Sequence, residues 1–277
     1  MPQARPLLFD FSASLRARQR AKRLDGERFL EQAAQDGLAD RLAAVTRTFE
    51  AGLWIGDSIP PQIAPFAQTW TLADFDAQEV LAAPGTFDLA ASLFSLQAIN
   101  DLAGALIQIR RILKPDGLFV GALLGGNTLA ELREAFAQAE IATRGGVSPR
   151  VAPLADVRDL GALLQRAGFA LPVSDVERLT VRYQNFFALV RDLRAHGLTN
   201  VMRERSKHPL RRDTLAALLA HYTAQNSEGG RLLARFETLY LTGWAPDEGQ
   251  QQPLKPGSAK TRLATALGTA EHSLNER

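Results

Sequence analysis

The chain has 277 residues, 46% of them hydrophobic and 22% charged, with a formal net charge of +2. This is the composition of a globular protein, and the near balance of charge argues against a nucleic-acid partner, while the absence of cysteine excludes disulfides and thiolate sites. No apolar run reaches membrane-spanning length and residues 1–10 lack a long apolar signal region, so we expect a cytoplasmic protein without a transmembrane segment.

The first 48 residues predict a helical arm. Residues 10–24 predict a helix with Ser12 or Ser14 as N-cap, and residues 27–48 predict one or two further helices. The first of these helices is strongly basic, so it is either a solvated face or a docking arm for an acidic partner. Its cations are Arg16, Arg18, Arg20, Lys22 and Arg23.

Residues 49–246 predict an α/β domain. Short, almost continuously apolar strands alternate with helices, which indicates a parallel sheet covered on both faces. A capping box, Thr128 to Glu131, is expected to open one helix, and residues 114–117 (KPDG) predict a turn. The strands are expected at 53–55, 69–75, 87–93, 118–124, 176–183 and 235–244, the helices at 102–113, 128–145 and 156–167, a helical insertion at about 184–231, and a flexible tail at 247–277.

The stretch FDLAASLFSLQAINDLAGALIQIRRILKPDGLFVGALLGGNTLAELR (87–133) resembles the class I S-adenosylmethionine (SAM)-dependent methyltransferases of the type-11 group. The resemblance extends to GGVSPRVAPLADVRDLGALLQRAGF (145–169) and RRDTLAALLAHY (211–222). In these stretches the chain is most similar to the arginine-hydroxylase-type assembly factors of respiratory complex I and their bacterial relatives. This resemblance implies a Rossmann-like class I methyltransferase fold with SAM as cofactor.

The family's SAM loop reads roughly LDLGxGxG, and the aligned residues depart from it. The first glycine is kept as Gly56, but the acidic position is Trp54 and the last glycine is Pro60. Side chains that replace these glycines are expected to obstruct the ligand, because glycine lets the backbone approach it. The resemblance implies cofactor contacts from Gly56, Asp57, Asp74, Asp76 and Ser95.

Two further departures follow. Only 31 positions separate Gly56 from Phe87, whereas the class I fold needs two βα units there and each takes roughly 25–30 residues, so about one unit is missing. Asp74 and Asp76 then remain to bind a ribose, or alternatively to cap a helix or a turn. The His-Trp pair that usually follows the FDL strand in the subgroup is Gln97-Ala98 here.

Other polar groups are candidates for a partner or substrate surface. Asn127, after the strand at 118–124, either lines a pocket or belongs to a tight turn. Arg211, Arg212 and Asp213 either clamp an acidic group or simply open a helix at the surface.

Two functions compete. The favoured hypothesis is a degenerate relative that acts as a binding or assembly module, with a respiratory-complex subunit or an active paralogue as protein partner. The alternative is an active SAM-dependent methyltransferase, or a related SAM enzyme, acting on a protein or a small molecule.

Overall fold

A computed structural model describes residues 7–24, 26–74, 82–250, 261 and 263–269. The chain divides into two compact units, residues 1–246 and 247–277. The second unit contains the short helix α8 (Leu263–Leu267). The first contains α1 (Phe11–Ala21), α2 (Phe29–Ala43), β1 (Phe49–Ile55), η1 (Ala64–Phe66), β2 (Ala67–Ala73), β3 (Phe87–Leu93), α3 (Leu102–Ile112), β4 (Leu113–Leu124), α4 (Ala130–Arg144), α5 (Val157–Arg166), β5 (Ala170–Tyr183), α6 (Phe186–Ala195), α7 (Arg212–Gln225), β6 (Ser227–Glu228) and β7 (Arg231–Trp244).

One sheet organises the first unit. Its strand order across the described residues is β2-β1-β3-β4-β7-β5, with the short β6 paired to β7. The strands β1 to β4 are parallel, and β7 lies antiparallel between β4 and β5. β3 is buried from Phe87 to Ser92, as expected for a parallel strand covered on both faces. The predicted α/β sheet is therefore confirmed.

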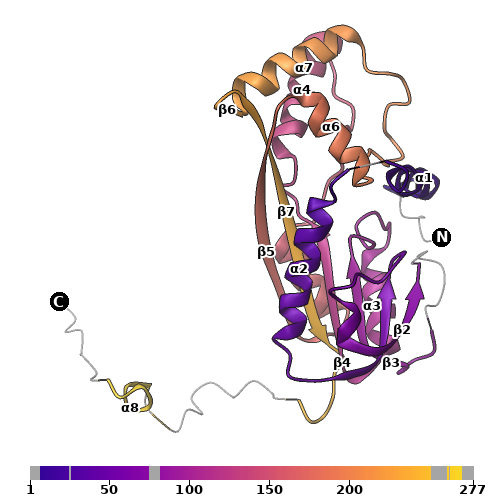
Figure 1. Cartoon of the computed structure of the whole chain (residues 1–277), viewed down its shortest axis with the longest axis vertical. Helices are drawn as coiled ribbons and strands as arrows, with labels where there is room; N and C mark the ends of the chain where they lie inside the picture. The colour runs from indigo at the N-terminus through magenta and orange to yellow at the C-terminus, as the bar shows by residue number, and fades with distance from the viewer. Residues whose placement is uncertain (1–6, 25, 75–81, 251–260, 262, 270–277) are drawn as a thin grey trace, which may run out of the picture. The chain divides into compact units, whose positions relative to one another are not determined.

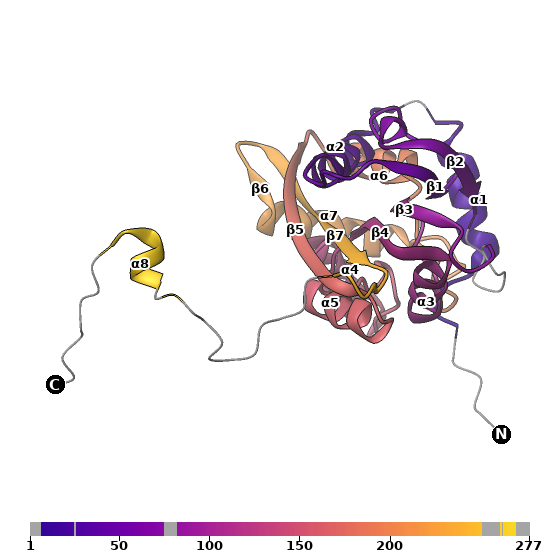
Figure 2. The ribbon, with the colours of Figure 1, turned by 90° about the horizontal axis from the view of Figure 1, so that it is seen from below.

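Helices cover both faces of the sheet. Helices α3 and α5 lie on one face and α2 lies on the other (Figure 2). The contacts are apolar: Leu106 and Ile109 of α3 belong to one buried cluster, while Leu38 and Leu42 of α2 belong to the cluster on the opposite face. Strands β5 and β7 extend past the parallel strands, and α4, α6 and α7 pack around that extension (Figure 1).

The region between β1 and β3 is shortened. It contributes one strand, β2, to the sheet among the described residues, which agrees with the expected loss of about one βα unit. The connection from β1 to β2, residues 56–66, is itself reduced. It contains only the 3-10 turn η1, whereas parallel strands are usually joined through an α-helix.

Two local predictions, the cap of α1 and the turn at 114–117, are wrong. Helix α1 is capped by Asp10 and not by Ser12 or Ser14, because the Asp10 carboxylate accepts from the Ala13 N–H at 3.0 Å. The turn at 114–117 is instead the irregular start of β4, where Asp116 has a φ of 58°.

The expected capping box does not form. The Thr128 hydroxyl lies 3.0 Å from the Glu237 N–H, and the Glu131 carboxylate accepts from the Arg235 N–H at 2.5 Å. Both side chains therefore bind the backbone of β7 rather than the N-terminus of α4, whose N-cap Leu129 has no side-chain hydrogen bond. The cause is that β7 continues beyond β4 and its backbone needs partners there.

Candidate functional site

A large cleft lies at the carboxyl ends of the parallel strands, the edge where ligands bind in open α/β sheets. Its volume is about 1910 Å³. Its floor includes residues just after β1, β3 and β4, and its walls come from α1, α4, α6 and residues 197–210. Figure 1 shows α1 lying across this end of the molecule, beside α6.

The candidate cofactor corner lies in this cleft. Gly56, Asp57 and Ser95 all line it, so the structure brings these three predicted residues together. The backbone of Gly56 has a φ of 155°, which favours glycine, and its N–H donates to the Ala73 carbonyl at 2.9 Å. The Trp54 side chain is buried beside it, edge-on to Trp70 with ring centroids 6.5 Å apart. A bulky indole therefore fills the place next to the loop.

Asp57 and Asp74, the described candidate acids, form ion pairs with cations of helix α1 and its C-cap. Arg18 lies 3.2 Å from the Asp74 carboxylate, directly after β2, and Lys22 lies 2.9 Å from the Asp57 carboxylate. The acids are thus neutralised by cations of the same chain. Asp76, the other predicted acid, lies outside the described residues.

Hydrogen bonds and an ion pair hold the segment before α1 against the cleft. The Asn100 side chain accepts from the Phe9 N–H at 2.8 Å and donates to the Phe9 carbonyl at 3.1 Å. The Asp10 N–H donates to the Val201 carbonyl at 2.8 Å, and Arg205 pairs with the Asp10 carboxylate at 3.0 Å. The next residue, Asp101, caps α3, where its carboxylate accepts from the Gly104 N–H at 2.9 Å.

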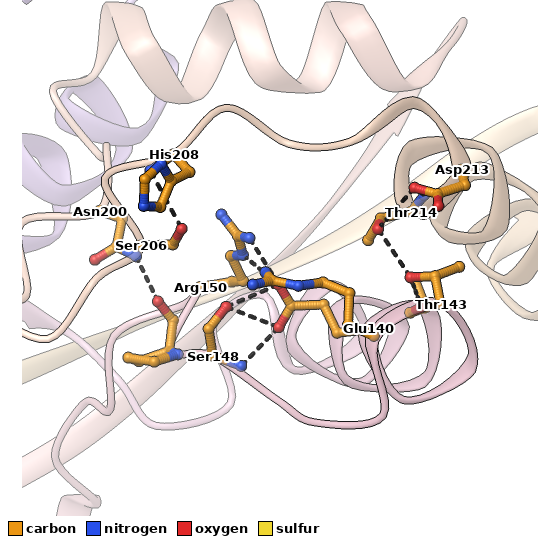
Figure 3. A network of polar contacts seen from close by, with 12 residues as sticks. Glu140, Thr143, Ser148, Arg150, Asn200, Ser206, His208, Asp213 and Thr214 are labelled. Atoms are coloured by element: carbon orange, nitrogen blue, oxygen red, sulfur yellow. Dashed lines mark hydrogen bonds and ion pairs between the residues drawn. The ribbon is translucent and has the colours of Figure 1, made fainter.

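One wall of the cleft depends on a buried carboxylate. Glu140 of α4 is fully buried and accepts hydrogen bonds from the Ser148 N–H, the Ser148 hydroxyl and the Arg150 guanidinium (Figure 3). Burial raises the pKa of Glu140, but the hydrogen bonds from Ser148 and Arg150 outweigh it, so the pKa lies below its ordinary value. Arg150 lines the cleft, and the Asn200 amide donates to the Pro149 carbonyl at 2.7 Å. The loop that resembles the family's GGVSPR segment is therefore held by hydrogen bonds to Ser148, Pro149 and Arg150.

Sequence reasoning also missed His196, at the end of α6. Its side chain is 2% exposed, and neither ring nitrogen has a hydrogen-bond partner among the described residues. It packs edge-on against Phe29 with centroids 4.9 Å apart. Burial lowers the pKa of His196 to about 4, so the imidazole is neutral at pH 7. A single histidine without a motif carries no sequence signal for such burial.

The residues predicted for a partner surface lie elsewhere. Asn127 does not line the cleft, and its amide donates to the Glu237 carboxylate at 3.0 Å. Arg211 pairs with Asp213 at 2.8 Å, and Asp213 also accepts from the Thr214 N–H. Arg211, Arg212 and Asp213 are exposed at the start of α7, outside the cleft lining.

Comparison with known proteins finds a family model and several similar proteins. A methyltransferase domain family model matches residues 7–172. The arginine-hydroxylase NDUFAF5, mitochondrial, of Danio rerio is 35% identical over 92% of this chain and 88% of its own length. The human protein of the same name is 44% identical over 63% of this chain, and the match covers 50% of the human chain.

Two further matches carry methyltransferase names. A malonyl-[acyl-carrier protein] O-methyltransferase of Laribacter hongkongensis is 35% identical over 69% of this chain and 62% of its own length. A crystal structure from Bacillus halodurans C-125, assigned to the methyltransferases, superposes with a TM-score of 0.51 and 14% identity over 77% of this chain and 99% of its own. At that identity the superposition indicates the fold alone.

Proposed function

Because the chain belongs to the methyltransferase domain family, we propose that it keeps this fold as a binding and assembly module whose SAM site is degenerate. One observation carries the proposal. Residues 56–66, which follow β1 at the candidate cofactor corner, contain no α-helix. A helix N-terminus that faces the ligand is the feature that holds the anionic end of a nucleotide-like ligand in this fold class.

The surroundings of this loop support the same proposal. Trp54 takes the place of the family's acidic residue and is buried against Trp70. Asp57 and Asp74 are paired with Lys22 and Arg18, so a ribose would have to displace a cation from each. These contacts support the proposal that the cofactor corner does not hold SAM.

The partner that we propose is a protein. The resemblance points to a subunit of respiratory complex I or to an active paralogue. The names of the NDUFAF5 relatives place those proteins in mitochondria, and a cytoplasmic location for this chain stays a proposal. No helix among the described residues is both long and apolar enough to cross a membrane.

An active SAM enzyme is the second candidate. Two observations favour it: Gly56 keeps its special backbone conformation, and Asp74 directly follows β2 where a ribose-binding acid is expected. The names of the relatives, an arginine hydroxylase and an O-methyltransferase, describe two chemistries that such an enzyme could have.

Calorimetric titration with SAM and with S-adenosylhomocysteine separates the two candidates. The binding-module proposal predicts no heat of binding at millimolar ligand. Dissociation constants in the micromolar range would overturn it and support the SAM enzyme, because enzymes commonly bind substrates at such levels.

A further inference from the structure

The cations that line the cleft fall into two groups. Four of them, Arg18, Lys22, Arg28 and Arg150, are each paired with an acidic side chain. Four others form no ion pair with any residue that the structure describes. These are Arg191 and Arg194 on α6, and Arg203 and Lys207 in the segment that follows it.

The four unpaired cations are exposed, and acids do little to offset them. Glu204 is the one acidic residue of the cleft lining, within the described residues, that has neither an ion pair nor a capping role. Asp192, between the two α6 arginines, acts electrostatically on Tyr183 and His196. A chain with a formal charge of only +2 thus concentrates positive charge at this place.

Apolar side chains share the same rim. Leu7, Phe11, Leu24 and Phe187 line the cleft and are 43% to 62% exposed. On α6, Phe187, Arg191 and Arg194 follow at helical spacing, so they share one face of the helix. Exposed aromatic residues beside arginines are characteristic of protein interfaces, where they supply much of the binding energy.

The size of the cleft selects the kind of ligand. Its volume of about 1910 Å³ is well above the roughly 300–1,000 Å³ of small-molecule pockets. Unpaired cations complement carboxylates, and the exposed leucine and phenylalanine side chains complement apolar residues.

We propose that this rim binds an acidic, amphipathic segment of a partner protein. The rim consists of four cations and four apolar side chains: Arg191, Arg194, Arg203, Lys207, Leu7, Phe11, Leu24 and Phe187. This inference rests on the proposed function as a binding module, and it names the chemistry of the partner. The segment lies in the cleft with its carboxylates toward α6 and residues 203–207 and with its apolar side chains toward Phe187 and the chain before α1.

Fluorescence anisotropy tests the proposal with a labelled peptide of about 12 residues that alternates Glu with Leu and Phe. We expect saturable binding that weakens as salt rises. The variant Arg191→Glu/Arg194→Glu should bind at least about tenfold more weakly, because a charge pair at a binding surface becomes repulsive. Phe187→Ser should also weaken binding without any change of charge.

Controls keep the test specific. Arg158→Glu/Arg166→Glu makes the same change of charge on α5, outside the cleft, and should leave the affinity unchanged. A peptide with Lys in place of Glu should not bind. All the substituted side chains are exposed, and thermal unfolding checks that each variant is folded.

Three results would overturn the inference. They are an affinity that the α6 variant does not change, an equal loss in the α5 variant, and tighter binding of a single-stranded oligonucleotide or of phosphatidylglycerol vesicles at the same residues. Calorimetry measures SAM binding at the cofactor corner, and anisotropy measures peptide binding at the rim. A failure of the proposed function can therefore be distinguished from a failure of this inference.

Discussion

Arg18 of helix α1 donates to Asp74, the first residue after β2, with 3.2 Å between nitrogen and oxygen although 56 positions separate the two. Asp74 stands where the fold would use an acid to bind a ribose. Four residues after Arg18, Lys22 at the C-cap of α1 pairs with Asp57 in the same way. The sequence predicted this basic segment to be either a solvated face or a docking arm for an acidic partner. In the structure two of its cations, Arg18 and Lys22, bind acids of the same domain.

These pairs are expected to contribute little to stability. Both involve partly exposed groups, for which water and salt screen the attraction. Arg18→Gln/Lys22→Gln should lower the free energy of unfolding by less than about 1 kcal/mol, and by less still in about 1 M salt. Urea denaturation at two salt concentrations measures this, with Arg211→Gln as a control outside the cleft. A loss of several kcal/mol in the free energy of unfolding at high salt would show that the two ion pairs are not weak surface pairs.

Glu140→Gln should be far more harmful. The substitution leaves Arg150, whose side chain is 15% exposed, without a carboxylate, and breaking a buried ion pair costs about 3–5 kcal/mol. Glu134→Gln, on the exposed side of the same helix, is the matched control and should change the unfolding free energy by no more than about 0.5 kcal/mol. Equal effects of the two substitutions in urea denaturation would show that the network is not a structural anchor.

The same carboxylate sets a pH dependence. The pKa of Glu140 is lower in the folded than in the unfolded chain, so its stabilising contribution is complete above the ordinary value of 4.5 and is lost as pH falls through the folded pKa. Denaturation curves of wild type and Glu140→Gln should therefore converge as the pH drops below about 4.5. A constant difference down to low pH would be inconsistent with an ionised Glu140.

His196→Leu should stabilise the protein in mild acid. The pKa of His196 falls from 6.5 to about 4 on folding, so between these values the unfolded chain binds a proton that the folded chain does not. At about pH 5 the substitution should raise the free energy of unfolding by roughly 2 kcal/mol more than at pH 7. The exposed His208→Leu serves as control, and an unchanged pH profile in the His196 variant would rule out a buried neutral imidazole.

Much of the fold could be predicted because its signals are local. The apolar run of β3, the stripe of α3 and the cap at Asp101 each depend on neighbours in the sequence. Gly145 and Gly168 follow the last turns of α4 and α5, with φ values of 69° and 84° that favour glycine. The length argument for a missing βα unit also held, since the sheet has one strand between β1 and β3 in chain order, β2, among the described residues.

The site depends on contacts between distant segments, and these could not be predicted. The Thr128–Glu131 pattern predicts a helix cap, but β7 supplies backbone groups that compete for both side chains. The two hydrogen bonds between Asn100 and Phe9 join residues that lie 91 positions apart. His196 packs edge-on against Phe29, which lies far from it in the sequence. In each case the partner is set by the tertiary fold rather than by spacing in the chain.

Calorimetric titration of wild type and of Arg18→Gln/Lys22→Gln with S-adenosylhomocysteine measures whether the cofactor corner binds this ligand. The variant releases Asp74 and Asp57 from their cations, so it separates the effect of helix α1 from that of the loop at 56–66. A degenerate SAM site should give no heat of binding at millimolar ligand in either protein, because the loop lacks the helix that would hold the ligand. Micromolar binding by either protein would show instead that the site is intact.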